Sequence, residues 1–180
     1  MKTIKRLSVV FALIVAATIS SCGGSNDDAA PAASIPANGT YINATADGAA
    51  FTTVIMGQSA GVALRSGTGA NSVIQVSGSS VNLATFASTS IAINLVGINA
   101  PGTYNVGYSS GSVLAYVTSA QGTSAIAYST GLCSTGATGT VTISTLTTAK
   151  IEGTFSFTGK NDGCTVTKSV TAGQFRGVFN

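Results

Sequence analysis

From Gly39 to the end of the chain, apolar residues alternate with serine, threonine and asparagine at a period of two, as in Ile91–Leu95 and Phe155–Phe157. Successive side chains of a β-strand point to opposite faces of a sheet, so this pattern is typical of strands that bury one face. Clusters of glycine, serine and asparagine recur at about 8 to 12 residues, the turn spacing of all-β domains. We therefore predict an all-β domain, a mostly antiparallel β-sandwich, with a barrel-like closed sheet as the alternative.

The alternation and the turn clusters also predict the individual strands, and no stretch after the N-terminal region has a helical period. The expected strands are Tyr41–Ala46, Phe51–Met56, Gly61–Arg65, Ser72–Val76, Ser80–Phe86, Ser90–Val96, Gly102–Tyr108, Ser112–Thr118, Ser124–Tyr128, Gly139–Leu146, Lys150–Thr158, Cys164–Val170 and Gly173–Phe179.

The N-terminal 21 residues have the order of a bacterial lipoprotein signal peptide. Lys2, Lys5 and Arg6 precede a largely apolar run of 13 residues, Leu7–Ile19, and Ser20-Ser21-Cys22 follows. A helix of that run is about 20 Å long, too short to be a stable transmembrane segment. We expect cleavage before Cys22 and lipidation of its thiol, which would attach the protein to a membrane.

Residues 22–38 are small, polar and contain proline, so we interpret them as the lipidated cysteine and a disordered linker before a single β domain at 39–180. Asp27 and Asp28 resemble the acidic signal that sends Bacteroidetes lipoproteins to the cell surface. The expected location is the outer membrane, with the cell surface favoured over the periplasmic face.

Charge is scarce and balanced after the signal peptide. Three of the eight basic residues lie in the signal, which leaves five basic and five acidic residues, and no charged residue occurs between Ser66 and Ala149. Nucleic-acid binding needs a basic patch, so nucleic acid is excluded as an expected partner. We expect the membrane, through the lipid, to be one partner, and a glycan or a surface protein to be the other.

Two cysteines remain in the mature domain, Cys133 and Cys164, and the cell envelope permits disulfides. Residues 139–146 and 150–158 form an expected hairpin that turns near Thr148. If Ile143 faces Phe155 and Val141 faces Phe157, the chain segments that carry the two cysteines leave the open end of the hairpin almost opposite each other. We predict a disulfide between them; two free thiols in neighbouring loops are the alternative.

Few residues are suited to catalysis. The chain has no histidine, and the domain has three acidic residues, Asp47, Glu152 and Asp162. Asp47 and Asp162 each precede glycine, which favours turns, and Glu152 is expected to point to solvent from a strand, with a cross-strand lysine as its partner. We predict no catalytic residue, no metal site and no cofactor.

Tyrosines are the best candidates for ligand contact, because aromatic rings on a hydroxyl-rich sheet can stack on sugars. Tyr104, Tyr108 and Tyr116 are the candidate ligand-binding residues, with Tyr128 as a further member. Burial in the core is the competing expectation for most of them, and the absence of tryptophan weakens the sugar interpretation.

Three segments of the C-terminal half, Gly139–Ile143, Lys150–Phe157 and Val166–Phe175, resemble the sequence of a family of Bacteroidetes lipoproteins known only as a domain of unknown function. Ala44–Phe51 is similar to the family's opening strand, with Phe51 where a tryptophan is usual. The resemblance spans about residues 44–179. It implies an envelope β domain and brings no catalytic residues with it.

Together these features predict a lipid-anchored protein of the bacterial cell envelope that is a non-enzymatic binding or structural module. The alternative is a glycan-acting enzyme or a carbohydrate-binding surface protein. A third hypothesis is self-association, because uncharged strands such as Ile91–Val96 have no charges that would prevent edge-to-edge pairing.

Overall fold

The computed structural model describes residues 38–179, which all belong to one compact unit. The predicted signal peptide (1–21), Cys22 and the Asp27-Asp28 pair lie outside the described residues. Within residues 38–179, no helical segment is long and apolar enough to span a membrane. The secondary structure of this range consists of strands and one short 3-10 turn, as predicted for an all-β domain.

The strands confirm the predicted fold class. They are β1 (Tyr41–Ala46), β2 (Ala49–Thr52), β3 (Val54–Ile55), β4 (Gln58–Ser59), β5 (Gly61–Ser66), β6 (Val73–Asn82), β7 (Ala87–Val96), β8 (Gly102–Val106), β9 (Val113–Ser119), β10 (Ile126–Ser129), β11 (Thr138–Leu146), β12 (Lys150–Lys160) and β13 (Thr167–Val178), with the 3-10 turn at Gly69–Asn71.

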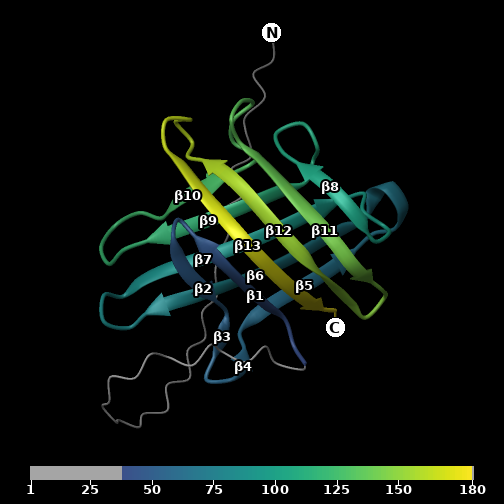
Figure 1. Cartoon of the computed structure of the whole chain (residues 1–180), viewed down its shortest axis with the longest axis horizontal. Helices are drawn as coiled ribbons and strands as arrows, with labels where there is room; N and C mark the ends of the chain where they lie inside the picture. Colours follow the sequence, from purple (N-terminus) through teal and green to yellow (C-terminus); the bar gives the residue numbers. More distant parts are fainter. Residues whose placement is uncertain (1–37, 180) are drawn as a thin grey trace. The chain divides into compact units, whose positions relative to one another are not determined.

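One large antiparallel sheet curls into two layers. Its strand order is β2-β1-β13-β12-β10-β9-β7-β6-β5, and β11 pairs with both β12 and β8. Figure 1 shows β1, β13, β12, β11 and β8 crossing over β9, β7, β6 and β5. We call these the front layer and the rear layer. Strands β3 and β4 form a separate small hairpin.

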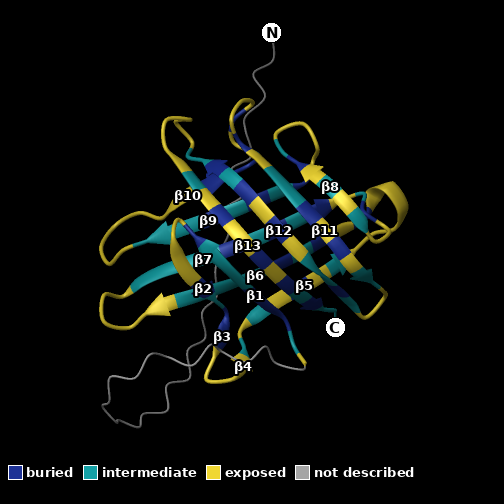
Figure 2. Ribbon diagram, in the orientation of Figure 1, coloured by how far each residue is buried: buried dark blue, intermediate teal, exposed yellow. Residues whose placement is uncertain are grey.

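The core fills the space between the two layers. Alternate residues along each strand are buried, which Figure 2 shows as alternating dark blue and yellow on β11, β12 and β13. Isoleucine, leucine and valine from the rear layer meet valine, isoleucine and phenylalanine from the front layer. The largest fully buried side chains are Phe175, Ile42, Ile74, Ile91, Ile93, Leu95, Leu114, Ile143, Ile151, Val76, Val141 and Val170.

The two layers are joined through β12 and β10. Most of β12 pairs with β11 and β13, and its last residue, Lys160, pairs with both Thr167 of β13 and Ser129 of β10. The Ser129–Lys160 pair is the one residue pair through which the described part of the chain connects β12 to β10. We call this place the seam.

Two predicted breaks in the strands are wrong. Residues 77–79 and 171–172 were expected to separate shorter strands, yet β6 and β13 run through them. Gly78 stays in β6 because it pairs with Gly61 of β5 and Ile91 of β7. A Cβ there would lie 2.4 Å from the Thr53 Cγ2, so the position requires glycine. Ala172 stays in β13 because the strand accommodates it as a bulge, with φ of 50°.

The predicted register of the β11–β12 hairpin is also wrong, by two residues. Val141 faces Phe155 and Ile143 faces Gly153. A shift of two residues keeps every side chain on its face, so the alternation could not distinguish the registers. A Cβ at position 153 would lie 2.2 Å from the Thr142 carbonyl oxygen, so this register needs the glycine that the sequence has there.

The segment Ile91–Val96 lies in the interior of the sheet. It belongs to β7, which pairs with β6 on one side and β9 on the other. Its backbone groups are therefore used within the domain, and the expectation that this segment adds strands edge to edge is wrong.

Candidate functional site

The outer face of the front layer carries rows of hydroxyl and amide side chains. The register places Thr103, Thr142, Thr154 and Gln174 side by side across β8, β11, β12 and β13. The next row contains Asn105, Thr140 and Ser156. Neighbouring rows are about 7 Å apart along a strand, and neighbouring strands are about 4.8 Å apart. The face is therefore a two-dimensional array of groups that donate and accept hydrogen bonds.

Two adjoining depressions of about 340 and 580 Å³ lie on this face. Both are lined by Thr140 and Ser156, so together they form a shallow groove along the outer side of β12. We call it the hydroxyl groove. Within residues 38–179, no charged residue lines it. Its outward-pointing members are Asn105, Thr138, Thr140, Thr142, Thr154, Ser156, Thr158, Ser169, Thr171 and Gln174.

A β-bulge shapes the groove on the β13 side. The register shifts between Phe155 and Phe157, so Ser156 lies opposite both Thr171 and Ala172. The φ of Ala172 is 50°, in the left-handed region that favours glycine. Bulges bend a strand and increase its twist, which gives this part of the sheet a curved outer surface.

Charged side chains lie beyond the Thr154–Gln174 end of the groove and are paired with one another. Glu152 accepts hydrogen bonds from Lys150 at 3.1 Å and from the Arg176 Nε at 2.7 Å. The Arg176 guanidinium also lies over the Tyr41 ring, 5.5 Å from its centroid. The Lys150 hydrogen bond and then the Arg176 hydrogen bond hold the pKa of Glu152 below its ordinary value. The cross-strand partner of Glu152 is thus Arg176 of β13 and not the predicted lysine; the lysine that pairs with Glu152, Lys150, lies on the same strand.

Replacing Glu152 with glutamine is expected to lower the free energy of unfolding by about 0.5 to 1 kcal/mol at pH 7, the size of a partly exposed ion pair. Because the folded pKa is lowered, this stabilisation is present above the ordinary glutamate value of about 4.3 and is lost as the pH falls through the folded pKa. The measurement is urea unfolding at a series of pH values. A constant difference down to pH 3 would contradict the ion-pair explanation, and Asp162→Asn, in an exposed loop, is the matched control.

Asp47 and Glu152 do not converge. The Asp47 backbone N–H donates to the Ser169 carbonyl and its side chain pairs with Lys168, whereas Glu152 faces Arg176, seven residues further along β13. Seven strand residues span about 20 Å, and paired glycosidase carboxyls lie about 5 to 9.5 Å apart. Asp47 occupies the turn between β1 and β2 with φ of 51°, as its predicted turn role requires, and Asp162 lies in the exposed loop after β12.

The tyrosine candidates are distributed over different parts of the fold. Tyr116 and Tyr128 are buried and face each other across β9 and β10, with ring centroids 6.1 Å apart. Burial, and then the charge of Asp47, raises the pKa of Tyr116. Tyr104 packs against the core and donates to the Ala100 carbonyl, while Tyr108 lies beyond the end of β8 with 61% of its surface exposed.

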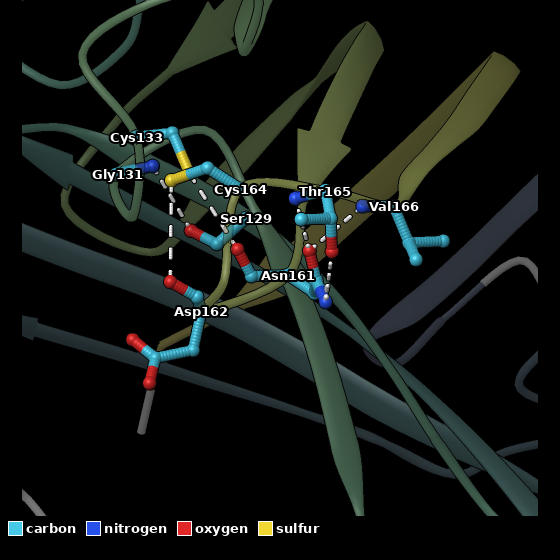
Figure 3. The surroundings of a disulfide bond; sticks show 8 residues. All are labelled: Ser129, Gly131, Cys133, Asn161, Asp162, Cys164, Thr165 and Val166. Atoms are coloured by element: carbon cyan, nitrogen blue, oxygen red, sulfur yellow. Dashed lines mark hydrogen bonds between the residues drawn. A yellow bond between two sulfur atoms is a disulfide. The ribbon is translucent and has the colours of Figure 1, made fainter.

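The predicted disulfide joins Cys133 to Cys164, whose Cα atoms are 5.9 Å apart (Figure 3). Each cysteine comes four residues after a member of the Ser129–Lys160 pair, so the bond lies at the seam. The Asn161 side-chain oxygen holds the loop before β13, accepting hydrogen bonds from the Thr165 and Val166 backbone N–H groups at 3.0 and 2.9 Å. Among the described residues, no three His, Cys, Asp or Glu side chains are grouped as metal ligands.

A family model described as a domain of unknown function, DUF6252, matches residues 38–179. The chain belongs to this family. The match covers the whole β domain, including the hydroxyl groove and the disulfide. Comparison with curated proteins and with solved structures found no match.

Sequence reasoning missed the hydroxyl groove in this DUF6252 domain. The candidate ligand-binding residues were aromatic, whereas the polar residues of the groove are threonine, serine, asparagine and glutamine. The signal was present in the alternation, because Thr140 and Thr142, like Thr154 and Ser156, occupy the non-core positions of their strands. The alternation does not give the order of the strands in the sheet, and it is this order that places β8, β11, β12 and β13 side by side.

Proposed function

We propose that this protein is lipid-anchored in the bacterial cell envelope through Cys22 and that its β domain binds a neutral glycan without reacting with it. The observation that carries the proposal is the hydroxyl groove, an uncharged depression lined by hydrogen-bonding side chains. The sequence order of signal peptide, Cys22 and linker supports the anchor.

The chemistry of the groove matches that of a neutral sugar chain. Hydroxyl and carboxamide groups both donate and accept hydrogen bonds, as sugar hydroxyls do. No charge lines the groove, so an ionic ligand would find no counter-charge there. The wide separation of Asp47 and Glu152 supports binding rather than hydrolysis as the activity.

The expected affinity is low. About four net hydrogen bonds of about 1 kcal/mol each correspond to a dissociation constant of about 1 mM. Such binding becomes effective when many copies are held on one membrane and engage the same polymer. Surface exposure, favoured by Asp27 and Asp28, would place the groove against extracellular glycans, and protease treatment of intact cells tests that location.

Affinity electrophoresis through gels that contain neutral polysaccharides tests the binding. The unchanged protein is expected to be retarded by at least one polysaccharide and to release no reducing ends from it. Ser156→Lys is expected to weaken binding about tenfold, because the new side chain fills the point shared by both depressions and removes a hydrogen-bonding group.

Ser77→Lys is the matched control, since Ser77 lies on the outer face of the rear layer between Val62 and Ala92. It is expected to leave the retardation unchanged. Equal retardation of the two lysine variants would contradict the groove as the binding site. Release of reducing ends would favour the alternative, a glycan-acting enzyme.

A further inference from the structure

Two neighbouring ends of the rear layer expose apolar side chains. The β6–β7 turn presents Leu83 and Phe86, which are 80% and 62% exposed, and the strand after the β9–β10 turn begins with Ile126, 49% exposed. The two turns lie side by side, because Ser88 pairs with Ser119 and their Oγ atoms are 2.8 Å apart. We call Leu83, Phe86 and Ile126 the apolar tip.

The fold does not account for the exposure of these residues. The Asn82 side-chain oxygen accepts hydrogen bonds from the Ala84 and Thr85 backbone N–H groups at 3.0 and 3.2 Å, so Asn82 makes the turn. Phe86 has φ of 51°, which is unfavourable for a bulky residue. Glycine or asparagine would suit that backbone better, so the backbone conformation does not explain an aromatic residue at this position.

The two turns that carry the apolar tip contain no charged residue. Both turns fall within the stretch from Ser66 to Ala149, which contains no aspartate, glutamate, lysine or arginine. Placing the two turns in the interfacial region of a bilayer would therefore dehydrate no charged side chain of their own. Exposed leucine and phenylalanine are the side chains that amphipathic surface elements bury about 5 to 10 Å into that region.

We propose that the apolar tip inserts into the phospholipid bilayer to which the chain is anchored, so that the rear layer is held end-on to the membrane. This inference rests on the lipid anchor of the proposed function. Fifteen residues separate Cys22 from Asn38. A chain segment of that length spans at most about 55 Å whatever its conformation, so the domain stays within reach of the bilayer.

Tryptophan fluorescence tests this directly, because the natural chain contains no tryptophan. Full-length Phe86→Trp protein is purified from membranes, reconstituted into phosphatidylcholine vesicles and recovered by flotation. Its emission is then compared in vesicles with brominated and unbrominated acyl chains. Tyr108→Trp is the matched control, since Tyr108 is equally exposed but precedes the opposite end of β9.

The bromines are expected to quench the Phe86→Trp protein strongly and the Tyr108→Trp protein little. Adding Leu83→Ser and Ile126→Ser to Phe86→Trp is expected to reduce the quenching.

Equal quenching of the two single variants, or a blue-shifted emission that bromine does not quench, would overturn the inference and leave the anchor intact. The second result would indicate that a second copy covers the tip. Failure to float with vesicles would overturn the anchor and the inference together.

Discussion

Replacing both Cys133 and Cys164 with serine is expected to lower the free energy of unfolding by about 4 kcal/mol. The bond spans a sequence separation of 31 residues, and the chain-entropy model gives a loss of that size for such a loop. A domain of this length is stable by about 5 to 15 kcal/mol. The disulfide therefore contributes a large part of the free energy of unfolding.

The position of the bond adds a structural reason for this effect. At the seam, one residue pair, Ser129 and Lys160, connects β12 to β10 within residues 38–179. The disulfide fixes the loops that leave these two strands. Without it, we expect the front and rear layers to separate first at the seam, with loss of protection of the β10 amides from hydrogen exchange.

Urea unfolding of the mature protein, with and without reductant, provides the measurement. Reductant is expected to bring the unchanged protein to the stability of the double serine variant and to leave that variant unaffected. A difference below about 0.5 kcal/mol, the size of an ordinary surface substitution, would contradict the role assigned to the bond.

Phe175→Ala is expected to cost about 4 kcal/mol, within the range for buried phenylalanine. The side chain is 1% exposed and meets Phe155 edge to face, with ring centroids 6.1 Å apart. It also lies against Gly153, so its removal leaves a cavity where β11, β12 and β13 pack together.

The matched control is Phe86→Ala, because Phe86 is 62% exposed on the apolar tip. Thermal unfolding is expected to show a large fall in Tm for Phe175→Ala and almost none for Phe86→Ala. A comparable loss in both would mean that the β6–β7 turn packs against the core, in conflict with its exposure.

The sequence was most informative where alternation and turn chemistry agree. The first strand, Tyr41–Ala46, has the predicted bounds, and Asp47-Gly48 makes the predicted turn after it. It was least informative at small residues inside strands. Gly78 and Ala172 look like breaks because glycine and alanine contribute little to a strand signal. Pairing with β5 and β7 keeps Gly78 in β6, and the bulge opposite Ser156 keeps Ala172 in β13.

The disulfide and the groove show two different limits of sequence reasoning. The pairing of Cys133 with Cys164 was predicted from a hairpin register that is wrong by two residues. The predicted disulfide is nevertheless correct, because both registers bring the segment before β11 and the segment after β12 together at the same end of the hairpin. The groove depends on β8 pairing with β11, a contact between segments about 38 residues apart. Period-two alternation identifies the outward face of each strand, but it carries no information on which strands are neighbours.

The most direct test of glycan binding through the hydroxyl groove is a backbone amide NMR titration of the mature protein with neutral oligosaccharides, including malto-, cello-, xylo- and manno-oligosaccharides. The account predicts that at least one series shifts amide signals of β11, β12 and β13, centred on Thr140 and Ser156, and that Ser156→Lys abolishes these shifts. Shifts confined to the rear layer or to the loop around Tyr108, or no shifts with any series, would contradict it.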